Sequence, residues 1–153
     1  MKTLFTTLFI LVSFALSAQN SPGSSADEAV VKKVISDQTD AFFAKNRDKW
    51  ASYWVHEPYI SWTAQGGADR VMTVAGWEDY SRMFEGYFSD PTPSQTKVLT
   101  ENMQVTVLDK VATATFLQTR QSAARELKSR EVRVLEKQGN DWKLIYVYSR
   151  NLP

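Results

Sequence analysis

The 153-residue sequence contains no cysteine and a single histidine, which excludes several kinds of chemistry before any motif is considered. Without cysteine there is no disulfide framework, no thiolate nucleophile, no Cys ligand for zinc and no lipid-modified cysteine at a cleavage site. The one histidine, His56, has no metal-ligand spacing around it. We therefore expect no metal ion and no cofactor.

The sequence also lacks an excess of charge of either sign. Lys and Arg number 18, and Asp and Glu number 17, which gives a formal net charge of +1. Nucleic acids and anionic membrane surfaces both favour proteins with a surplus of Lys and Arg. We therefore expect neither nucleic acid nor a membrane surface as a partner.

Long apolar runs are missing apart from one near the start of the sequence. Lys2 precedes an apolar run at 4–16 and then Ser17 and Ala18, which is the order typical of a secretory signal peptide. The run is too short to cross a membrane, which needs roughly 20 apolar residues. We expect 1–18 to be a signal peptide, cleaved after Ala18 or after Ser17, and the mature chain to be exported to the periplasm or the medium.

The rest of the sequence is expected to form a short leader and one domain. Residues 19–25 (QNSPGSS) are small and polar, a composition typical of a flexible segment. Residues 26–153 have the size of a single domain and are long enough to bury a hydrophobic core.

Hydrophobic periodicity predicts the order of secondary structure in this domain. Apolar residues three and four apart predict helices at 26–45 and 77–88, and a short helix around Trp50, Tyr53 and Trp54. Runs rich in β-branched and aromatic residues predict a hairpin of strands at 59–63 and 70–74. Four further strands, joined by short turns as an antiparallel meander, are expected at 97–108, 111–120, 127–137 and 142–150.

Three segments carry a resemblance to known proteins: KNRDKWASYW at 45–54, GWEDY at 76–80 and DWKLIYVYS at 141–149. Together with the order of elements, they resemble the nuclear transport factor 2-like (cystatin-like) superfamily, and the last segment is similar to the terminal strand of SnoaL-like families. The resemblance covers 26–150. It implies an α+β fold in which a curved, mostly antiparallel sheet wraps the first helix and forms a cone with a pocket at its open end.

Aromatic residues provide the main signal for ligand binding, because Trp and Tyr combine large apolar faces with one polar group. We expect a small molecule to be bound by Phe43, Tyr53, Trp54, Trp62, Arg120, Tyr146 and Tyr148. Arg120 falls at a strand end and could hold a carboxylate or a developing oxyanion; an exposed ion pair with Glu131 or Glu126 is the alternative. The aromatic side chains could also fill the core or a dimer face.

His56 is the first candidate for a catalytic base, because only histidine has an unperturbed pKa near neutrality. The alternative is a structural histidine that bonds backbone at a helix end. The ketosteroid-isomerase branch of the superfamily has an acidic base in its first strand, just before a proline. The corresponding strand here reads YISWTA at 59–64 and holds no acid, which argues against that chemistry.

Side-chain alternation on the last strand also leads to an expected oligomer. The two-residue period places one set of residues, Trp142, Leu144, Tyr146, Tyr148 and Arg150, on one face, and another set, Ile145, Val147 and Ser149, on the other. Both faces are largely apolar, so we expect helices to cover one face and the second subunit of a homodimer to cover the other.

Three functions remain open from the sequence. The first is an exported domain that binds a small apolar or aromatic molecule. The second is a cofactor-independent acid/base enzyme of the cyclase, isomerase or dehydratase type, with His56 as base and Tyr53, Tyr146 or Tyr148 as donor. The third is a homo-oligomeric assembly module resembling the association domain of calcium/calmodulin-dependent protein kinase II.

Overall fold

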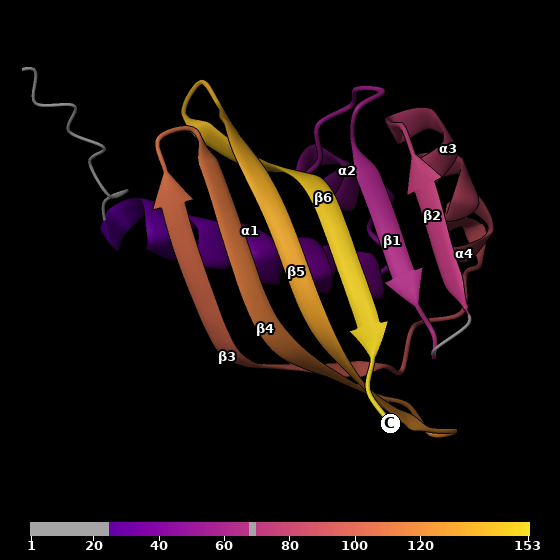
Figure 1. The fold of residues 1–153 in the computed structure, drawn as a ribbon. Coiled ribbons are helices and arrows are strands. Elements are labelled where there is room, and N and C mark those ends of the chain that lie inside the picture. Colours follow the sequence, from indigo (N-terminus) through magenta and orange to yellow (C-terminus); the bar gives the residue numbers. More distant parts are fainter. Residues whose placement is uncertain (1–24, 68–69) are drawn as a thin grey trace, which may run out of the picture.

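The computed structural model describes residues 25–67 and 70–153, in which helices pack against one six-stranded sheet (Figure 1). This arrangement confirms the α+β fold predicted from the sequence. The expected signal peptide, 1–18, and all but the last residue of the expected leader lie outside the described residues. In the part of the chain that is described, no helix combines the length and the apolar character needed to cross a membrane.

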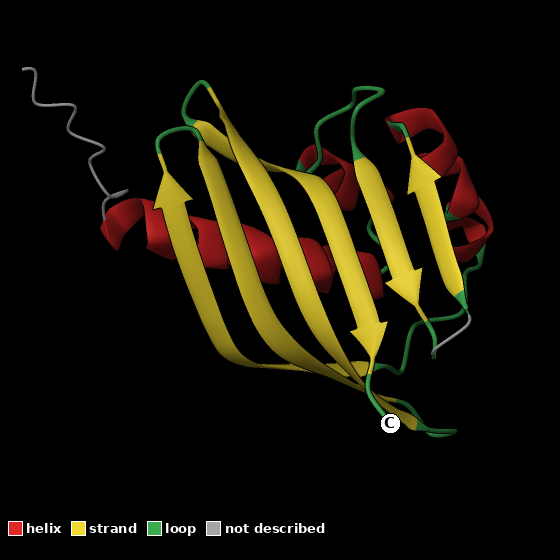
Figure 2. Ribbon diagram, viewed as in Figure 1, coloured by secondary structure: helices red, strands yellow, loops and turns green. Residues whose placement is uncertain are grey.

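The long first helix, α1, covers Ser25–Phe43 and crosses one face of the sheet (Figure 2). Two acidic residues, Asp27 and Glu28, lie in its first turn, where they complement the partial positive charge of the helix N-terminus. The short helix α2, Arg47–Ser52, follows after Asn46, whose Oδ1 accepts a hydrogen bond from the backbone N–H of Lys49 at 3.1 Å. Both helices were predicted from the spacing of their apolar residues, but α2 ends at Ser52, so Tyr53 and Trp54 lie outside it because Trp54 pairs with Leu144 of the sheet.

The helix predicted at 77–88 is two helices, α3 at Trp77–Met83 and α4 at Glu85–Ser89. They meet at Phe84, whose φ of −99° and ψ of 5° leave the α-helical region. The periodicity did not reveal this break, because the Phe84 ring still faces the same aromatic cluster as its neighbours in sequence. Its contacts with Trp50 and Tyr80 maintain the apolar spacing across the break.

The sheet has the strand order β2-β1-β6-β5-β4-β3. Its strands are β1 Ser61–Gln65, β2 Val71–Ala75, β3 Lys97–Leu108, β4 Val111–Gln121, β5 Glu126–Gln138 and β6 Asp141–Asn151. Strands β1 and β6 pair in parallel and all other neighbours pair antiparallel. The predicted hairpin and meander are confirmed, although β1 begins two residues later than expected because Pro58 and Tyr59 lie in a turn.

Two irregularities bend the sheet around α1. On β3 the pairing with β4 shifts between Glu101 and Gln104, where Asn102 adopts a positive φ of 55°. On β6 one extra residue, Ile145, interrupts the pairing with β5 between Val134 and Leu135. Bulges of this kind bend a strand and increase its twist, and the strands curve over the helix in Figure 2.

The bulge at Ile145 changes which side chains of β6 face α1. Trp142 and Leu144 are buried against the helix layer, and after the bulge Val147 and Ser149 take that face. The prediction that Tyr146 and Tyr148 share a face with Trp142 and Leu144 is therefore wrong. A strict two-residue period cannot anticipate an inserted residue, because the insertion reverses the phase of every later side chain.

One end of the space between α1 and the sheet is closed by polar contacts around Asp27. Its Oδ1 accepts hydrogen bonds from Trp142 Nε1 at 3.0 Å and from Lys137 Nζ at 2.9 Å. Beyond these contacts the interior is filled by buried apolar side chains, including Val31 and Ile35 of α1. The core therefore fills this end, and the opposite end, at the last turns of α1, is left for a cavity.

Candidate functional site

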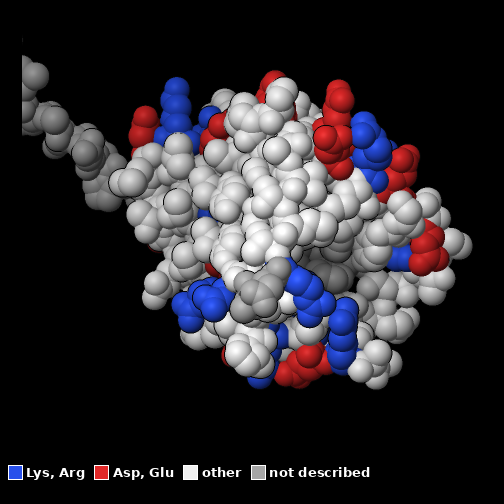
Figure 3. All heavy atoms as spheres, turned by 45° about the vertical axis from the view of Figure 1, so that its right-hand side comes forward, with Lys and Arg blue, Asp and Glu red and all other residues white. Residues whose placement is uncertain are grey.

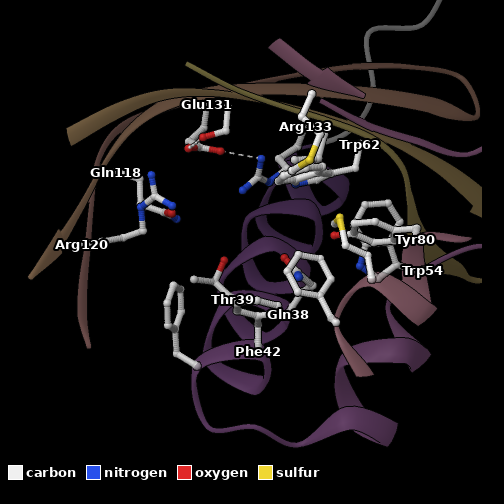
Figure 4. A pocket seen from close by; sticks show the side chains of 16 residues that line it. Gln38, Thr39, Phe42, Trp54, Trp62, Tyr80, Gln118, Arg120, Glu131 and Arg133 are labelled. Atoms are coloured by element: carbon white, nitrogen blue, oxygen red, sulfur yellow. Dashed lines mark hydrogen bonds and ion pairs between the residues drawn. The ribbon is translucent and has the colours of Figure 1, made fainter. Parts of the chain in front are cut away.

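A cavity of about 410 Å³ lies between the last two turns of α1 and the sheet (Figure 4). Helices α1 and α3 and strands β1, β2, β4, β5 and β6 contribute residues to its lining. The lining residues are Gln38, Thr39, Phe42, Phe43, Trp54, Trp62, Met72, Tyr80, Met83, Phe84, Gln118, Arg120, Glu131, Arg133, Val147 and Ser149. Most are apolar or aromatic, and the charged ones come from two neighbouring strands, β4 and β5.

The aromatic wall of the cavity is built around Trp54, which is held by backbone pairing. Val55 N donates to Leu144 O at 3.0 Å, and Leu144 N donates to Tyr53 O at 2.8 Å, so the segment after α2 pairs with β6. This pairing directs Trp54 inward, where its ring centroid lies 4.6 Å from that of Tyr80. Burial raises the pKa of Tyr80, so its phenol keeps its proton at neutral pH.

Phe42 forms the opposite side of the aromatic wall, at the end of α1. Its ring stacks on Tyr87 with centroids 4.8 Å apart and an angle of 16° between the planes. It meets Phe84 edge-on at 5.0 Å and Phe88 edge-on at 5.6 Å. These contacts fix α4 against α1 and give this wall a defined shape.

The polar wall of the cavity centres on Glu131 and Arg133, which point inward from β5. Glu131 is only 1% exposed, and its Oε1 accepts hydrogen bonds from Ser129 Oγ and Ser149 Oγ, each at 2.6 Å. Its Oε2 lies 2.6 Å from Arg133 Nη1, which makes a buried ion pair although the contact lacks the direction of a hydrogen bond. Three partners thus hold the carboxylate in place.

Several buried donors on this wall have no hydrogen-bond partner in the described part of the chain. They are Gln118 Nε2, Arg120 Nε and Arg133 Nε. Arg120 uses its Nη2 to donate to Asn151 Oδ1 at 3.1 Å. Burial lowers the pKa of Arg120, and the Glu131 carboxylate acts in the opposite direction. The described residues of this wall therefore offer unpaired hydrogen-bond donors, and they include two guanidinium groups but one carboxylate.

Four of the side chains that the sequence analysis proposed for ligand binding line this cavity: Phe43, Trp54, Trp62 and Arg120. Tyr53, Tyr146 and Tyr148 are absent from the lining. The Tyr53 hydroxyl donates to Asp37 at 3.3 Å, which ties α2 to α1. The Tyr148 hydroxyl donates to Gln65 Oε1 at 2.6 Å between neighbouring strands. Both tyrosines already have structural partners.

His56 also lies outside the cavity lining. Its ring stacks on Trp77 with centroids 4.0 Å apart and an angle of 9° between the planes. Its Nε2 lies 2.9 Å from the carbonyl oxygen of Ala51, in the last turn of α2. This is the backbone contact at a helix end that the sequence analysis gave as the alternative to a catalytic role.

Three residues of the polar wall, Gln118, Glu131 and Arg133, were not predicted as site residues from the sequence. A signal for two of them is present in β5, where Glu131 and Arg133 lie two residues apart in phase with Leu135. A strand whose apolar face changes to charged residues is typical of a core that opens into a polar site. The exposed ion pair expected as the alternative for Arg120 is not among the contacts of the described residues, because Glu131 pairs with Arg133 and Glu126 with Lys128.

A metal centre has no candidate ligands in the residues that the structure describes. No group of three or more His, Asp or Glu side chains in 25–67 and 70–153 is placed to hold a metal ion. Of the described residues that line the cavity, Glu131 is the one carboxylate, and its partners are two hydroxyl groups and a guanidinium. The chemistry that this arrangement offers is hydrogen bonding and charge.

The family model of the SnoaL-like domain matches residues 31–150. Because the match spans most of the sequence, the chain belongs to the SnoaL-like domain family, within the nuclear transport factor 2-like superfamily. No curated protein shows significant similarity to it.

Solved structures with the same fold have low sequence identity to this chain. A nuclear transport factor 2-like protein of unknown function from Pseudomonas putida has a TM-score of 0.69 at 16% identity, over 83% of this chain and 87% of that one. A cystatin-like fold protein from Burkholderia xenovorans has a TM-score of 0.66 at 16% identity, over 86% and 98%. The association domain of Caenorhabditis elegans calcium/calmodulin-dependent protein kinase II has a TM-score of 0.65 at 17% identity, over 81% and 95%. These similarities show the fold alone.

Proposed function

We propose that this protein binds a small, mainly apolar or aromatic molecule in the cavity between α1 and the sheet. The observation that carries the proposal is a cavity of about 410 Å³ whose lining joins an aromatic wall to a few fixed polar groups. Small-molecule sites typically have volumes of about 300–1,000 Å³, largely apolar walls and a small number of placed hydrogen-bonding groups. Binding here would consist of burial and stacking against Trp54, Trp62 and Phe43, with orientation set by the polar wall.

A second candidate is a cofactor-independent acid/base enzyme that uses the same cavity. The observation that favours it is a buried carboxylate, Glu131, in the same cavity as Tyr80, whose pKa is raised by burial. A phenol that keeps its proton can donate to a developing oxyanion. His56 is outside the lining, so a catalytic role for it would require a substrate that extends beyond the cavity.

The sheet face opposite α1 is the surface through which we propose a homodimer. Tyr146 and Tyr148 of β6 are half-buried there, and Leu108 and Val111 are exposed where β3 turns into β4. Figure 3, which views the molecule obliquely from the strand side, shows charged side chains mainly toward the upper and lower edges. Light scattering checks this proposal, because a monomer at all concentrations rules it out and a larger ring favours an assembly module.

Export is a separate proposal that rests on the sequence of residues 1–18, and N-terminal sequencing of the protein from culture fractions tests it. A chain that begins after Ser17 or Ala18 in the periplasm or the medium supports export. An intact N-terminus in the cytoplasm contradicts it.

Native mass spectrometry of the protein, purified without added ligand, tests ligand binding directly. Extra mass that leaves on denaturation would support a binding cavity and give the formula of the bound molecule. A Thr39→Trp variant supplies the blocked form, because Thr39 is buried and lines the cavity from α1. An Asp40→Trp variant is the matched control, because the next residue of α1 is exposed. Ligand lost from both variants alike, or retained by both, would contradict binding at this site.

A further inference from the structure

We infer that the ligand of this cavity carries a carboxylate, which binds at the polar wall between Arg120, Arg133 and Gln118. The inference rests on the proposed ligand-binding function and names the chemical class of its ligand. It follows from three observations on the described residues: unpaired buried donors, an excess of one positive charge in the cavity, and the aromatic side chains that line the rest of it.

The donor atoms that carry this inference are buried and unpaired, although other atoms of Arg120 and Arg133 have partners. Gln118 is 4% exposed and Arg133 is 7% exposed, yet Gln118 Nε2 and Arg133 Nε have no hydrogen-bond partner among the residues that the structure describes. Arg120 Nε, also buried, lacks a partner too. A buried donor without a partner costs about 1–3 kcal/mol, and more when it is charged. A bound acceptor group would remove this cost at all three atoms.

Charge in the cavity favours an anion as that acceptor. Among the described residues, the lining holds two guanidinium groups, Arg120 and Arg133, and one carboxylate, Glu131. Glu131 is engaged by Arg133 at 2.6 Å, whereas the hydrogen bond of Arg120 in the described part of the chain goes to the neutral amide of Asn151 at 3.1 Å. Burial disfavours the charged form of Arg120 and lowers its pKa. One carboxylate on the ligand would balance the remaining positive charge.

The arrangement of the donors fits a carboxylate. Arg120 and Gln118 project from β4 on one side of the cavity, Arg133 projects from the adjacent strand β5, and Thr39 and Phe42 lie across from them on α1 (Figure 4). A planar carboxylate accepts hydrogen bonds from guanidinium and amide N–H groups in this kind of setting. Trp54 and Tyr80 lie on the side away from Arg120 and Gln118, and Trp62 lies beside Arg133. These three rings would contact an apolar body. The class is therefore an aromatic or aliphatic monocarboxylate.

Matched pairs of acids and amides test this inference. The probes are phenylacetate, 3-phenylpropionate, indole-3-acetate and octanoate, each compared with its primary amide by isothermal titration calorimetry of the full-length mature protein. Each amide has nearly the shape of its acid and lacks the charge. We expect at least one acid to bind on the order of 10-fold or more tightly than its amide, because charge-assisted hydrogen bonds are the stronger kind.

Variants distinguish the contribution of the polar wall to acid binding from a general effect of the charge of the protein. Arg120→Met keeps the aliphatic stem and removes the guanidinium, and we expect it to weaken binding of the acid about 10-fold while leaving the amide unchanged. Gln118→Leu removes the Nε2 donor without changing any charge and is expected to weaken the acid by a smaller factor. Arg130→Met is the control, because Arg130 is exposed on the same strand as Arg133 and does not line this cavity. Circular dichroism verifies that each variant is folded.

The outcomes distinguish this inference from the function on which it rests. Amides that bind as tightly as their acids would overturn the carboxylate inference and leave ligand binding standing. Acids that bind equally well to the parent and to Arg120→Met would also overturn it. If neither acids nor amides bind and no mass is retained in native spectra, the proposed function falls with it.

Discussion

Arg133 Nη1 lies 2.6 Å from Glu131 Oε2 in a buried ion pair formed by two side chains on the same face of β5. Taking two charges out of water costs about as much as their attraction returns, so such a pair is seldom a source of net stability. What the pair provides is position. With Ser129 and Ser149 bonded to the other carboxylate oxygen, Glu131 is fixed, and the guanidinium that it holds is fixed in the cavity.

The first prediction concerns the removal of one member of this pair. Glu131→Gln leaves the Arg133 guanidinium buried without an anion, and we expect the free energy of unfolding to fall by about 3 kcal/mol. Urea denaturation monitored by tryptophan fluorescence measures it. Glu126→Gln is the control, because its 3.4 Å pair with Lys128 is exposed and such pairs contribute roughly 0–1 kcal/mol. A loss for Glu131→Gln no larger than for the control would show that Arg133 readily finds another partner.

The second prediction separates the two roles considered for His56. His56→Ala removes the stacking on Trp77 and the contact with Ala51 O, so we expect stability to fall by about 1 kcal/mol. Ligand affinity is expected to stay unchanged, because His56 does not line the cavity. Thermal unfolding and calorimetry measure the two quantities. Abolished ligand turnover in a folded His56→Ala protein would instead establish the acid/base role.

The third prediction concerns two glycines. Replacing them by alanine is expected to change the stability of the protein in opposite directions. Gly76 precedes α3 with a φ of 82°, a conformation that side chains disfavour, so Gly76→Ala is expected to destabilise the protein by about 1 kcal/mol. Gly86 lies inside α4 with open space around its would-be Cβ. Gly86→Ala is therefore expected to stabilise it by about 0.5–1 kcal/mol. Chemical denaturation of both variants measures the difference, and equal effects would contradict the assignment of strain to Gly76.

Much of the fold could be predicted because the spacing of apolar residues within each segment indicates whether it forms a helix or a strand. The three- and four-residue spacing in α1 and the long β-type runs from 97 onward predicted elements close to those observed. The failures occur where one residue changes the phase. Ile145 inserts into β6 and moves Tyr146 and Tyr148 to the outer face, and Phe84 breaks a helix without breaking its apolar spacing.

The candidate site was predicted less completely than the fold, for a physical reason. Aromatic residues such as Trp54 and Trp62 signal burial by their composition alone, and both line the cavity. Charged residues usually lie on the surface, so the sequence alone predicts that Glu131 and Arg133 are exposed. Their burial becomes evident only when their neighbours in space are known. One partner of Glu131, Ser149, lies 18 residues away in sequence and meets it through the pairing of β5 with β6.

The last prediction concerns the ionisation of Tyr59, whose hydroxyl donates to Glu136 Oε1 at 2.5 Å. This hydrogen bond raises the pKa of Tyr59 to about 12, because ionising the phenol would break the bond and place a second negative charge beside the carboxylate. The folded value exceeds the unfolded value of about 10, so the folded state holds this proton more tightly. The stabilisation is therefore fully present below pH 10 and is lost as the pH rises toward 12.

Glu136→Gln tests this arrangement, because it removes the negative charge next to the Tyr59 phenol. We expect the pKa of Tyr59 to move from about 12 toward 10, measured as the difference in absorbance titration between proteins with and without Tyr59→Phe in each background. Glu57→Gln is the matched control, because Glu57 acts on Tyr59 only through its charge and ranks below Glu136 among the causes of the shift. If Tyr59 titrates near 10 in the parent protein, or if the two variants lower its pKa equally, the bond to Glu136 is not what holds the proton.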